Sequence, residues 1–174
     1  MSKTFYFACL LFIGIFGSCS QNDIDFDDNI DTNFDDPIDT NNIDIQKLLD
    51  MVNEVRASGT TCETTYYPPV GAVTWNSTLE AAALKHSKDM KDNDFFSHTS
   101  FNGDKFVDRL NAAGYNYNNA GENIALGYST EENVINAWLT SQGHCANIMN
   151  PNFTEMGVGR IENYWTQDFG KPKE

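Results

Sequence analysis

The sequence has few basic residues and no long apolar run. Lysine and arginine together number 11, against 25 aspartate and glutamate residues, which gives a formal net charge of −14. Proteins that bind nucleic acid need a basic surface, so this composition argues against a nucleic-acid partner. The longest apolar run covers twelve residues, from Phe5 to Phe16, whereas a membrane-spanning helix needs about 20. The run is therefore too short to predict a transmembrane helix.

The usual catalytic motifs are also missing. The sequence contains no G-x-S-x-G elbow, no H-E-x-x-H pair, no Walker phosphate-binding loop, no dinucleotide-binding fingerprint and no C-x-x-C pair. These motifs mark serine hydrolases, zinc peptidases, nucleotide-binding proteins and clustered-cysteine metal sites. Candidate functional residues must therefore be sought outside the standard signatures.

What is present begins with a secretory pattern. Lys3 precedes the apolar run, and small residues follow it up to Cys19. A basic start and a short apolar core are typical of a secretory signal, which we assign to residues 1–18. The letters FGSC at its end resemble a lipobox, although Phe16 stands where leucine is usual. We expect secretion across the inner membrane and a lipid on Cys19 that holds the protein in the outer membrane or at the cell surface. The alternative is an ordinary cleavage site with Cys19 as a plain thiol.

The segment that follows is strongly acidic. Residues 23–44 contain nine acidic residues, no basic ones, and isolated apolar residues without a sustained period. Such a segment cannot bury enough apolar area to offset its chain entropy. We therefore predict that residues 19–44 form a disordered tether, which also resembles the surface-export signal of some Gram-negative lipoproteins. The predicted membrane partner is reached through the lipid and this tether.

The four cysteines favour one disulfide. Cys9 lies within the predicted signal and Cys19 is the predicted lipid site, which leaves Cys62 and Cys145 as a pair. In an oxidising compartment, such a pair is expected to form a disulfide. The alternative is a thiol dyad of His144 and Cys145. We favour the disulfide because the side chains of adjacent residues usually point apart.

Hydrophobic spacing predicts one domain over residues 45–174 with helices mainly before paired strands. Helical patterns occur at about 46–57, from Ser77, at about 104–113 and from Ser129, and the second and fourth begin with a capping box. Strand patterns occur at 122–127, 156–161 and 164–170, with a hairpin turn at Glu162 and Asn163. Residues 61–75 include paired prolines and predict an extended loop. This order predicts an α+β fold in which helices cover an antiparallel sheet.

Polar residues near the ends of these elements are the candidates for chemistry. They are His98, Glu122, His144 and Glu155. Each also has a structural explanation, because such a histidine often bonds backbone carbonyls and a glutamate can bridge loops or lie in a turn. His86 lies on the apolar face of its predicted helix, so we expect it to be structural. The three tryptophans are likewise expected to pack in the core and the sheet.

Five blocks of the sequence form a more specific pattern. They are AAALKHSKDM, FFSH, AGENIALG, VINAWLTSQGHCANIMNPNFTEMGVG and YWTQDFG, in this order within residues 45–170. Together they resemble the CAP superfamily, named for cysteine-rich secretory proteins, antigen 5 and pathogenesis-related proteins, and more closely its bacterial secreted branch. The resemblance implies an α-β-α sandwich around a small antiparallel sheet. It also implies a surface cleft in which two histidines and two glutamates converge.

Three positions of this sequence match the residues of that cleft. The resemblance places His98, Glu122 and His144 there. The remaining glutamate lies one turn beyond a helical tryptophan in animal and plant members, and it falls on Ser141 here. Glu155 is typical of the bacterial branch and is the carboxylate that could take its place.

The expected chemistry follows from these residue types. Two imidazoles, from His98 and His144, can hold zinc or another divalent cation, with Glu122 positioning a water or orienting a ligand. The absence of a carboxylate at Ser141 lowers the charge and basicity of such a site. No cofactor is required by the sequence.

These features predict a lipid-anchored, non-catalytic binding module outside the cell, whose cleft binds a divalent metal or a small apolar ligand. One alternative is a zinc-assisted, peptidase-like hydrolase in which His98 and His144 hold the metal and Glu122 or Glu155 is the general base. Another is a structural surface or adhesion protein with an envelope or host partner. The lack of a nucleophile with a recognisable base favours the binding module.

Overall fold

The computed structural model describes residues 41–173. Its helices are α1 (Ile45–Ser58), α2 (Ser77–Asp92), α3 (Phe106–Ala112), α4 (Glu131–Leu139) and α5 (Gln142–Ile148). Its strands are β1 (Thr60–Cys62), β2 (Thr65–Tyr67), β3 (Thr74–Trp75), β4 (Tyr117–Leu126), β5 (Glu155–Ile161) and β6 (Tyr164–Pro172). The predicted signal, Cys9, Cys19 and the tether up to residue 40 lie outside the described residues. Among the helices of residues 41–173, none has the length and apolar character needed to cross a membrane.

Four of the strands form one sheet in the order β3–β5–β6–β4. β6 pairs antiparallel with both β5 and β4, whereas β3 adds two residues parallel to β5. The turn between β5 and β6 contains Glu162 in the left-handed region, with φ 53°, and it confirms the predicted hairpin. β1 and β2 form a separate antiparallel hairpin, where the sequence predicts only an extended loop.

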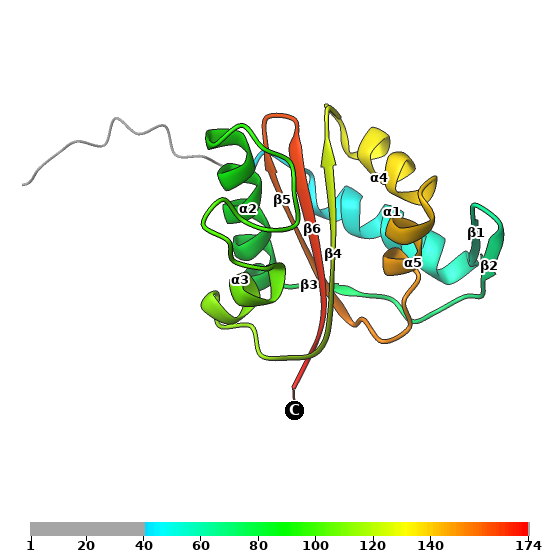
Figure 1. Ribbon diagram of the computed structural model, residues 1–174. Helices are drawn as coiled ribbons and strands as arrows, with labels where there is room; N and C mark the ends of the chain where they lie inside the picture. Colours follow the sequence, from blue (N-terminus) through cyan, green and yellow to red (C-terminus); the bar gives the residue numbers. More distant parts are fainter. Residues whose placement is uncertain (1–40, 174) are drawn as a thin grey trace, which may run out of the picture. The chain divides into compact units, whose positions relative to one another are not determined.

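Helices cover both faces of the four-stranded sheet (Figure 1). α2 and α3 lie on one face, and α1, α4 and α5 lie on the other (Figure 1). This arrangement confirms the predicted α+β class and the α-β-α sandwich that the resemblance implies. The sheet is antiparallel as predicted, except at the short strand β3.

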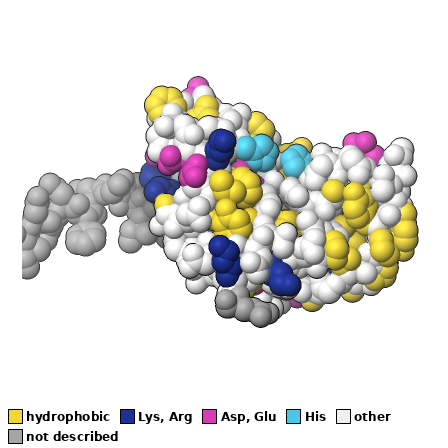
Figure 2. All heavy atoms as spheres, turned by 60° about the horizontal axis from the view of Figure 1, so that its bottom comes forward, with side chains coloured by type: hydrophobic (Ala, Val, Ile, Leu, Met, Phe, Trp, Pro, Cys, Tyr) yellow, Lys and Arg dark blue, Asp and Glu magenta, His cyan; other side chains and the backbone are white. Residues whose placement is uncertain are grey.

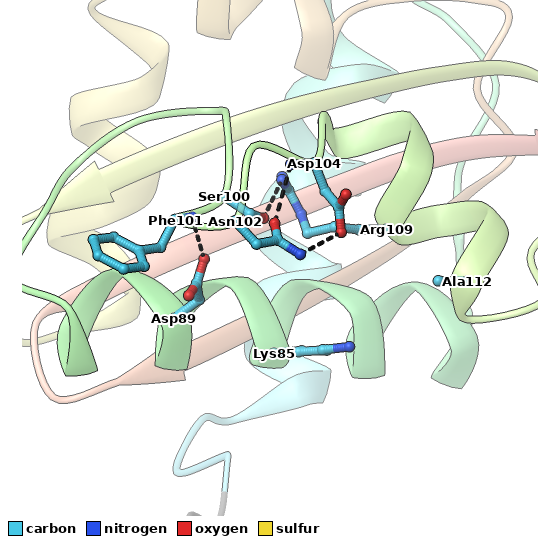
Figure 3. Close-up of a pocket in the computed structure, with 8 residues that line it drawn as sticks. All are labelled: Lys85, Asp89, Ser100, Phe101, Asn102, Asp104, Arg109 and Ala112. Carbon is cyan, nitrogen blue, oxygen red and sulfur yellow. Dashed lines mark hydrogen bonds between the residues drawn. The ribbon is translucent and has the colours of Figure 1, made fainter.

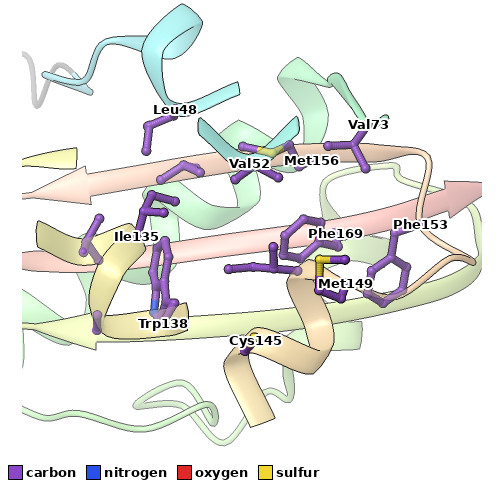
Figure 4. Packing of buried hydrophobic residues seen from close by; sticks show 14 of the residues in the cluster. Leu48, Val52, Val73, Ile135, Trp138, Cys145, Met149, Phe153, Met156 and Phe169 are labelled. Atoms are coloured by element: carbon purple, nitrogen blue, oxygen red, sulfur yellow. The ribbon is translucent and has the colours of Figure 1, made fainter. Parts of the chain in front are cut away.

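The main hydrophobic core lies between the sheet and the layer of α1, α4 and α5 (Figure 4). Trp138 on α4 and Trp165 on β6 are its largest fully buried side chains, and Trp75 is partly buried against it, as predicted. Further buried members include Leu48, Val52, Ile135, Ile148, Met149, Met156, Val158 and Phe169. Full burial of one such side chain stabilises the fold by about 1.5–3 kcal/mol. The core therefore fixes α4 and α5, the two helices that border the candidate site.

On the opposite face, two glycines allow α2 to approach β5 closely. A Cβ atom added to Gly157 would overlap the backbone of Glu80, and one added to Gly159 would overlap the backbone of Leu84. The small residues in MGVG are thus required by packing. Because α2 is held against the sheet, the loop that follows it, which carries His98, also has a fixed starting point.

α5 is a helix that the sequence analysis does not predict, because its seven residues have no clear apolar period. It is held by a disulfide between the fully buried Cys62 and Cys145. It is also held by Arg56, which donates from Nη1 to the Ile148 carbonyl oxygen at 2.6 Å. The disulfide confirms the predicted cysteine pair and rules out a thiol dyad of His144 and Cys145.

Two helix starts differ by one residue from the predicted capping boxes. The Asn76 side chain caps α2 in place of Ser77, and the Thr130 side chain caps α4 in place of Ser129. Asn and Thr are both favourable capping residues, and each has the extended backbone that a cap needs. The helices are therefore predicted correctly, but their caps are wrong by one residue.

Residues 41–44 belong to the predicted tether, yet Asn41 is bonded to the domain. Its side chain donates to the Val158 carbonyl oxygen at 2.7 Å and to Glu80 Oε1 at 2.9 Å, and it accepts from the Arg160 backbone N–H at 2.9 Å. These bonds satisfy the Val158 carbonyl group and the Arg160 N–H group of β5. Both residues lie beyond the two residues of β5 that pair with β3. The folded domain thus includes residues before position 45.

Candidate functional site

Glu122 lies at the centre of the candidate site, on the edge strand β4. Its side chain is 1% exposed, and each carboxylate oxygen has its own partner. Oε1 lies 2.7 Å from His98 Nδ1, and Oε2 accepts from Arg109 Nη2. Because a carboxylate can only accept a hydrogen bond, His98 Nδ1 carries the proton and donates it to Glu122. Nε2 of the half-exposed His98 ring takes no part in this bond. The structure thus brings His98 and Glu122 together, as the resemblance predicts.

Arg109, on α3, is a site residue that the sequence analysis misses. Its buried guanidinium donates to Glu122, and Nη1 also donates to the His98 carbonyl oxygen at 3.0 Å and to Ser100 Oγ at 3.1 Å. It therefore fastens the loop between α2 and α3 to the buried carboxylate. The sequence feature that could have indicated Arg109 is a basic residue on the inward face of the predicted helix 104–113.

Arg109 also lines a cavity of about 200 Å³ between α2 and the loop before α3 (Figure 3). We call it the second cavity, to distinguish it from the groove beside His144. The walls of this cavity are held by polar bonds. Asp89 Oδ2 accepts from the Phe101 backbone N–H at 2.9 Å, and Asn102 donates to Asp104 at 2.8 Å. These bonds order the loop and so support the position of the site residues on it.

His144 reaches the same surface from α5. The two imidazoles lie close enough for His98 to act electrostatically on His144, and Figure 2 shows histidine side chains next to each other on the surface. The His144 carbonyl oxygen accepts from Asn123 Nδ2 at 3.2 Å, which ties α5 to the residue after Glu122. Burial, and then the nearby imidazole of His98, lower the pKa of His144. The His144 ring is therefore neutral at pH 7.

An apolar groove of about 310 Å³ borders His144. Nine residues line it: Phe96, Ile124, Ala125, Leu126, Tyr128, Ala137, Trp138, Ser141 and His144. Phe96 and Leu126 are 48% and 43% exposed, so the groove has an apolar rim in contact with solvent. Ser141 lies in this wall and makes no side-chain capping bond to α5. The position where animal and plant members carry a glutamate thus faces an apolar groove in this protein.

The structure does not bring Glu155 to the cluster around Glu122. Its Oε2 accepts from the Tyr115 hydroxyl at 2.7 Å and from Asn76 Nδ2 at 3.2 Å. Burial, followed by the bond to Glu155, raises the pKa of Tyr115, which keeps the phenol protonated as a donor. These contacts give Glu155 a structural role, joining the segment before β4 to the start of α2.

Two more titratable groups are buried behind Glu122. His86 is fully buried and lies 2.8 Å from the Ser97 carbonyl oxygen through Nε2, and burial lowers its pKa, in keeping with the predicted structural role. Asp168 on β6 is the direct register partner of Glu122 and is 1% exposed. No sequence motif identifies Asp168, although an acid at an inward position of a predicted strand is the signal that could have found it.

The residues around His98 and His144 do not fit a zinc site. Zinc sites in proteins use three or four protein ligands. Within residues 41–173, no group of three or more His, Cys, Asp and Glu side chains is arranged to hold a metal ion. Both oxygens of Glu122 are already engaged by His98 and Arg109, which leaves two imidazoles as the available ligands.

Comparison with known protein sequences supports the resemblance of the sequence blocks. The sequence model of the CAP, or cysteine-rich secretory protein, family matches residues 49–169. The uncharacterised Bacillus subtilis protein YkwD is 46% identical over 96 residues, which are 54% of this chain and 37% of the relative. The uncharacterised membrane protein YlbC from Bacillus subtilis is 32% identical over 126 residues, which are 72% of this chain and 34% of the relative. The matches thus span well under half the length of either relative.

Two solved structures have the same fold. An extracellular protein from Bacillus anthracis that contains an SCP domain gives a TM-score of 0.65 at 34% identity, covering 72% of this chain and 39% of that one. An outer surface protein from Borrelia burgdorferi gives a TM-score of 0.64 at 23% identity, covering 74% of this chain and 92% of that one. The second likeness shows the fold alone.

Proposed function

The chain belongs to the cysteine-rich secretory protein (CAP) family, and from that premise we propose that it is an extracellular binding module for a small apolar ligand. The observation that carries the proposal is the groove of about 310 Å³, which is lined mainly by apolar side chains and has His144 in its wall. Binding sites for small molecules are typically concave and apolar with a few polar groups that fix orientation. The ligand's polar end would meet His98 and His144, while its apolar part would lie in the groove.

The proposal also includes a location outside the cell. The relative from Bacillus anthracis, at 34% identity, is described as extracellular, and the buried disulfide suits an oxidising compartment. The predicted signal at 1–18 supports the same location. We further propose that lipid on Cys19 attaches the domain to the outer membrane or cell surface through residues 19–44, where an apolar ligand or an envelope partner is within reach.

The contacts of the two glutamates support binding over hydrolysis. A general base needs an acceptor atom that can reach a reacting proton. Both oxygens of Glu122 are engaged by His98 and Arg109, and Glu155 is bonded to Tyr115 and Asn76. Among residues 41–173, zinc would also find fewer protein ligands than a catalytic site uses.

Uptake of a neutral probe by the full chain tests this proposal. The probe is a fluorescent long-chain alcohol, and we expect saturable binding. Ala137→Trp should abolish uptake, because Ala137 lines the groove and the new ring would fill it. Ala112→Trp is the matched control, since Ala112 lines the second cavity instead, and this variant should bind as wild type does.

Two further measurements separate the alternatives. Replacement of His98 and His144 by Ala should weaken uptake about tenfold, the value of one or two lost hydrogen bonds, and a chelator should have no effect. The proposal fails if wild-type protein takes up no probe, or if Ala137→Trp binds equally well. Loss of binding on chelation, with recovery on adding zinc, would instead favour a metal site.

A further inference from the structure

Asp168 is a buried acid that faces Glu122 across the pairing of β4 with β6. The two residues are direct register partners, and both are buried, so their side chains lie next to each other on one face of the sheet. Oδ1 of Asp168 has no hydrogen-bond partner among the described residues. When two carboxyl groups meet in a buried site, ionisation of both is strongly disfavoured, and the pair holds one proton.

The groups around Glu122 and Asp168 carry one positive charge, which balances one negative charge on the two acids. Arg109 reaches Glu122 from α3 as a permanent cation. His86 faces the same cluster from α2, and burial lowers its pKa, so its ring is neutral at pH 7. His98 contributes an Nδ1–H bond from the loop after α2. Burial, and then the charge on Glu122, raise the pKa of Asp168 well above its usual range, which agrees with this balance.

The hydrogen bonds decide which of the two acids holds the proton. The oxygens of Glu122 accept from the His98 ring and the Arg109 guanidinium, and a donor bonds more strongly to a charged acceptor than to a neutral one. Among residues 41–173, no side chain donates a comparable bond to Asp168. An unpartnered buried oxygen also costs less on a neutral carboxyl group than on a carboxylate. The proton therefore belongs on Asp168.

We propose that Asp168 is the second carboxyl group of the cleft, a positioning residue that stays protonated, donates to Glu122 and holds that carboxylate against His98. This inference rests on the proposed function, because it assigns Asp168 a role in the same binding site. The carboxylate expected from other family members is missing at Ser141. Asp168 supplies a second acid from β6 instead, and because this acid is buried and neutral, it adds no charge to the apolar groove.

Carbon-13 NMR of the full chain tests the protonation directly. We expect the side-chain carboxyl signal of Asp168 to have the position of a protonated acid at pH 7, and to remain there between pH 5 and pH 7. A free aspartate side chain in a short model peptide provides the reference for an ionised carboxylate. A carboxylate signal for Asp168 at pH 7 would overturn the proposal.

Two variants separate a proton donor from a space-filling side chain. Asp168→Asn can donate an N–H to Glu122, as the protonated acid does, whereas Asp168→Leu is branched at the same carbon atom, is larger and cannot donate. We expect the first to keep the His98 Nδ1–H tautomer in the ring nitrogen-15 spectrum and to bind the alcohol probe within about twofold of wild type. The second should shift the tautomer balance towards Nε2–H and weaken binding about tenfold.

Identical His98 ring spectra in the two variants would contradict the positioning role. The ring and carboxyl signals are measured without any probe, so they report on Asp168 even where the groove takes up no ligand. If Asp168→Leu does not fold, the carboxyl signal of the wild-type chain still decides the protonation, and Asp168→Asn still has to preserve the His98 tautomer.

Discussion

At the scale of single residues, the buried Glu122 carboxylate accepts hydrogen bonds from the His98 imidazole and the Arg109 guanidinium. Removing its charge would break the ion pair with the buried Arg109. Because breaking a buried ion pair from one side leaves an uncompensated charge, we expect Glu122→Gln to lower the free energy of unfolding by about 3 kcal/mol. Urea unfolding at pH 7 measures this change.

The matched control for this substitution is an acid in an exposed ion pair. Asp92 lies 2.9 Å from Lys88 on the surface of α2, and solvent screens such pairs. Asp92→Asn should therefore leave the free energy of unfolding almost unchanged. If Glu122→Gln behaved like this control, Glu122 would not be the counter-charge of Arg109.

His144 gives the site a predictable response to acid. Its pKa in the folded protein is lowered by burial and by His98, so the unfolded chain binds more protons at mildly acidic pH. Above about pH 6.5 the ring is mainly neutral in both states, and the free energy of unfolding has its full value. It decreases as the pH falls through that value towards the folded-state pKa of His144. His144→Gln should thus lose less stability than wild type between pH 7.5 and pH 5.5.

Urea unfolding of both proteins at the two pH values measures that difference. The buried His86 shares the acid sensitivity in both proteins, since burial lowers its pKa as well. The comparison therefore isolates the contribution of His144. A larger acid-induced loss of stability in His144→Gln than in wild type would contradict this interpretation.

At the scale of elements, the contact between α2 and β5 depends on two glycines. A Cβ atom at Gly157 or Gly159 would overlap the α2 backbone, which cannot move aside as a flexible side chain can. We expect Gly157→Ala and Gly159→Ala each to destabilise the fold by about 3 kcal/mol, the upper end for overpacking. Thermal unfolding measures the loss.

Gly143 is the matched control, because it lies within α5 and an added Cβ would meet nothing within 4 Å. Gly143→Ala should raise stability by about 0.5–1 kcal/mol, since alanine favours the helix. Equal effects at all three positions would show that close packing of α2 is not the reason for the glycines.

The helices and strands that could be predicted from the sequence are those with a regular hydrophobic period. α1, α2 and the β5–β6 hairpin carry regular patterns and were predicted from them. α5 has no such pattern, because the disulfide at Cys145 and the bond from Arg56 hold it in place. Its existence depends on contacts between distant segments, which local spacing does not encode.

At the scale of the whole molecule, the resemblance identified His98, Glu122 and His144, whose positions converge in space. Local patterns could not place them together, because they come from a loop, an edge strand and a short helix. Arg109 and Asp168 were missed for a related reason. Each meets Glu122 only after α3 and β6 have packed around β4, and neither belongs to a recognised motif.

The central claim is that the groove beside His144 holds an apolar ligand. Its most direct test is nitrogen-15 NMR of the full chain during titration with the alcohol probe. The account predicts that signals of Ala137, Ser141, His144 and the Trp138 indole move together and saturate, because these groups line the groove. Signals of Asn102 and Ala112, which line the second cavity, should stay in place. Shifts confined to the second cavity, or no shifts in the groove at saturating probe, would contradict it.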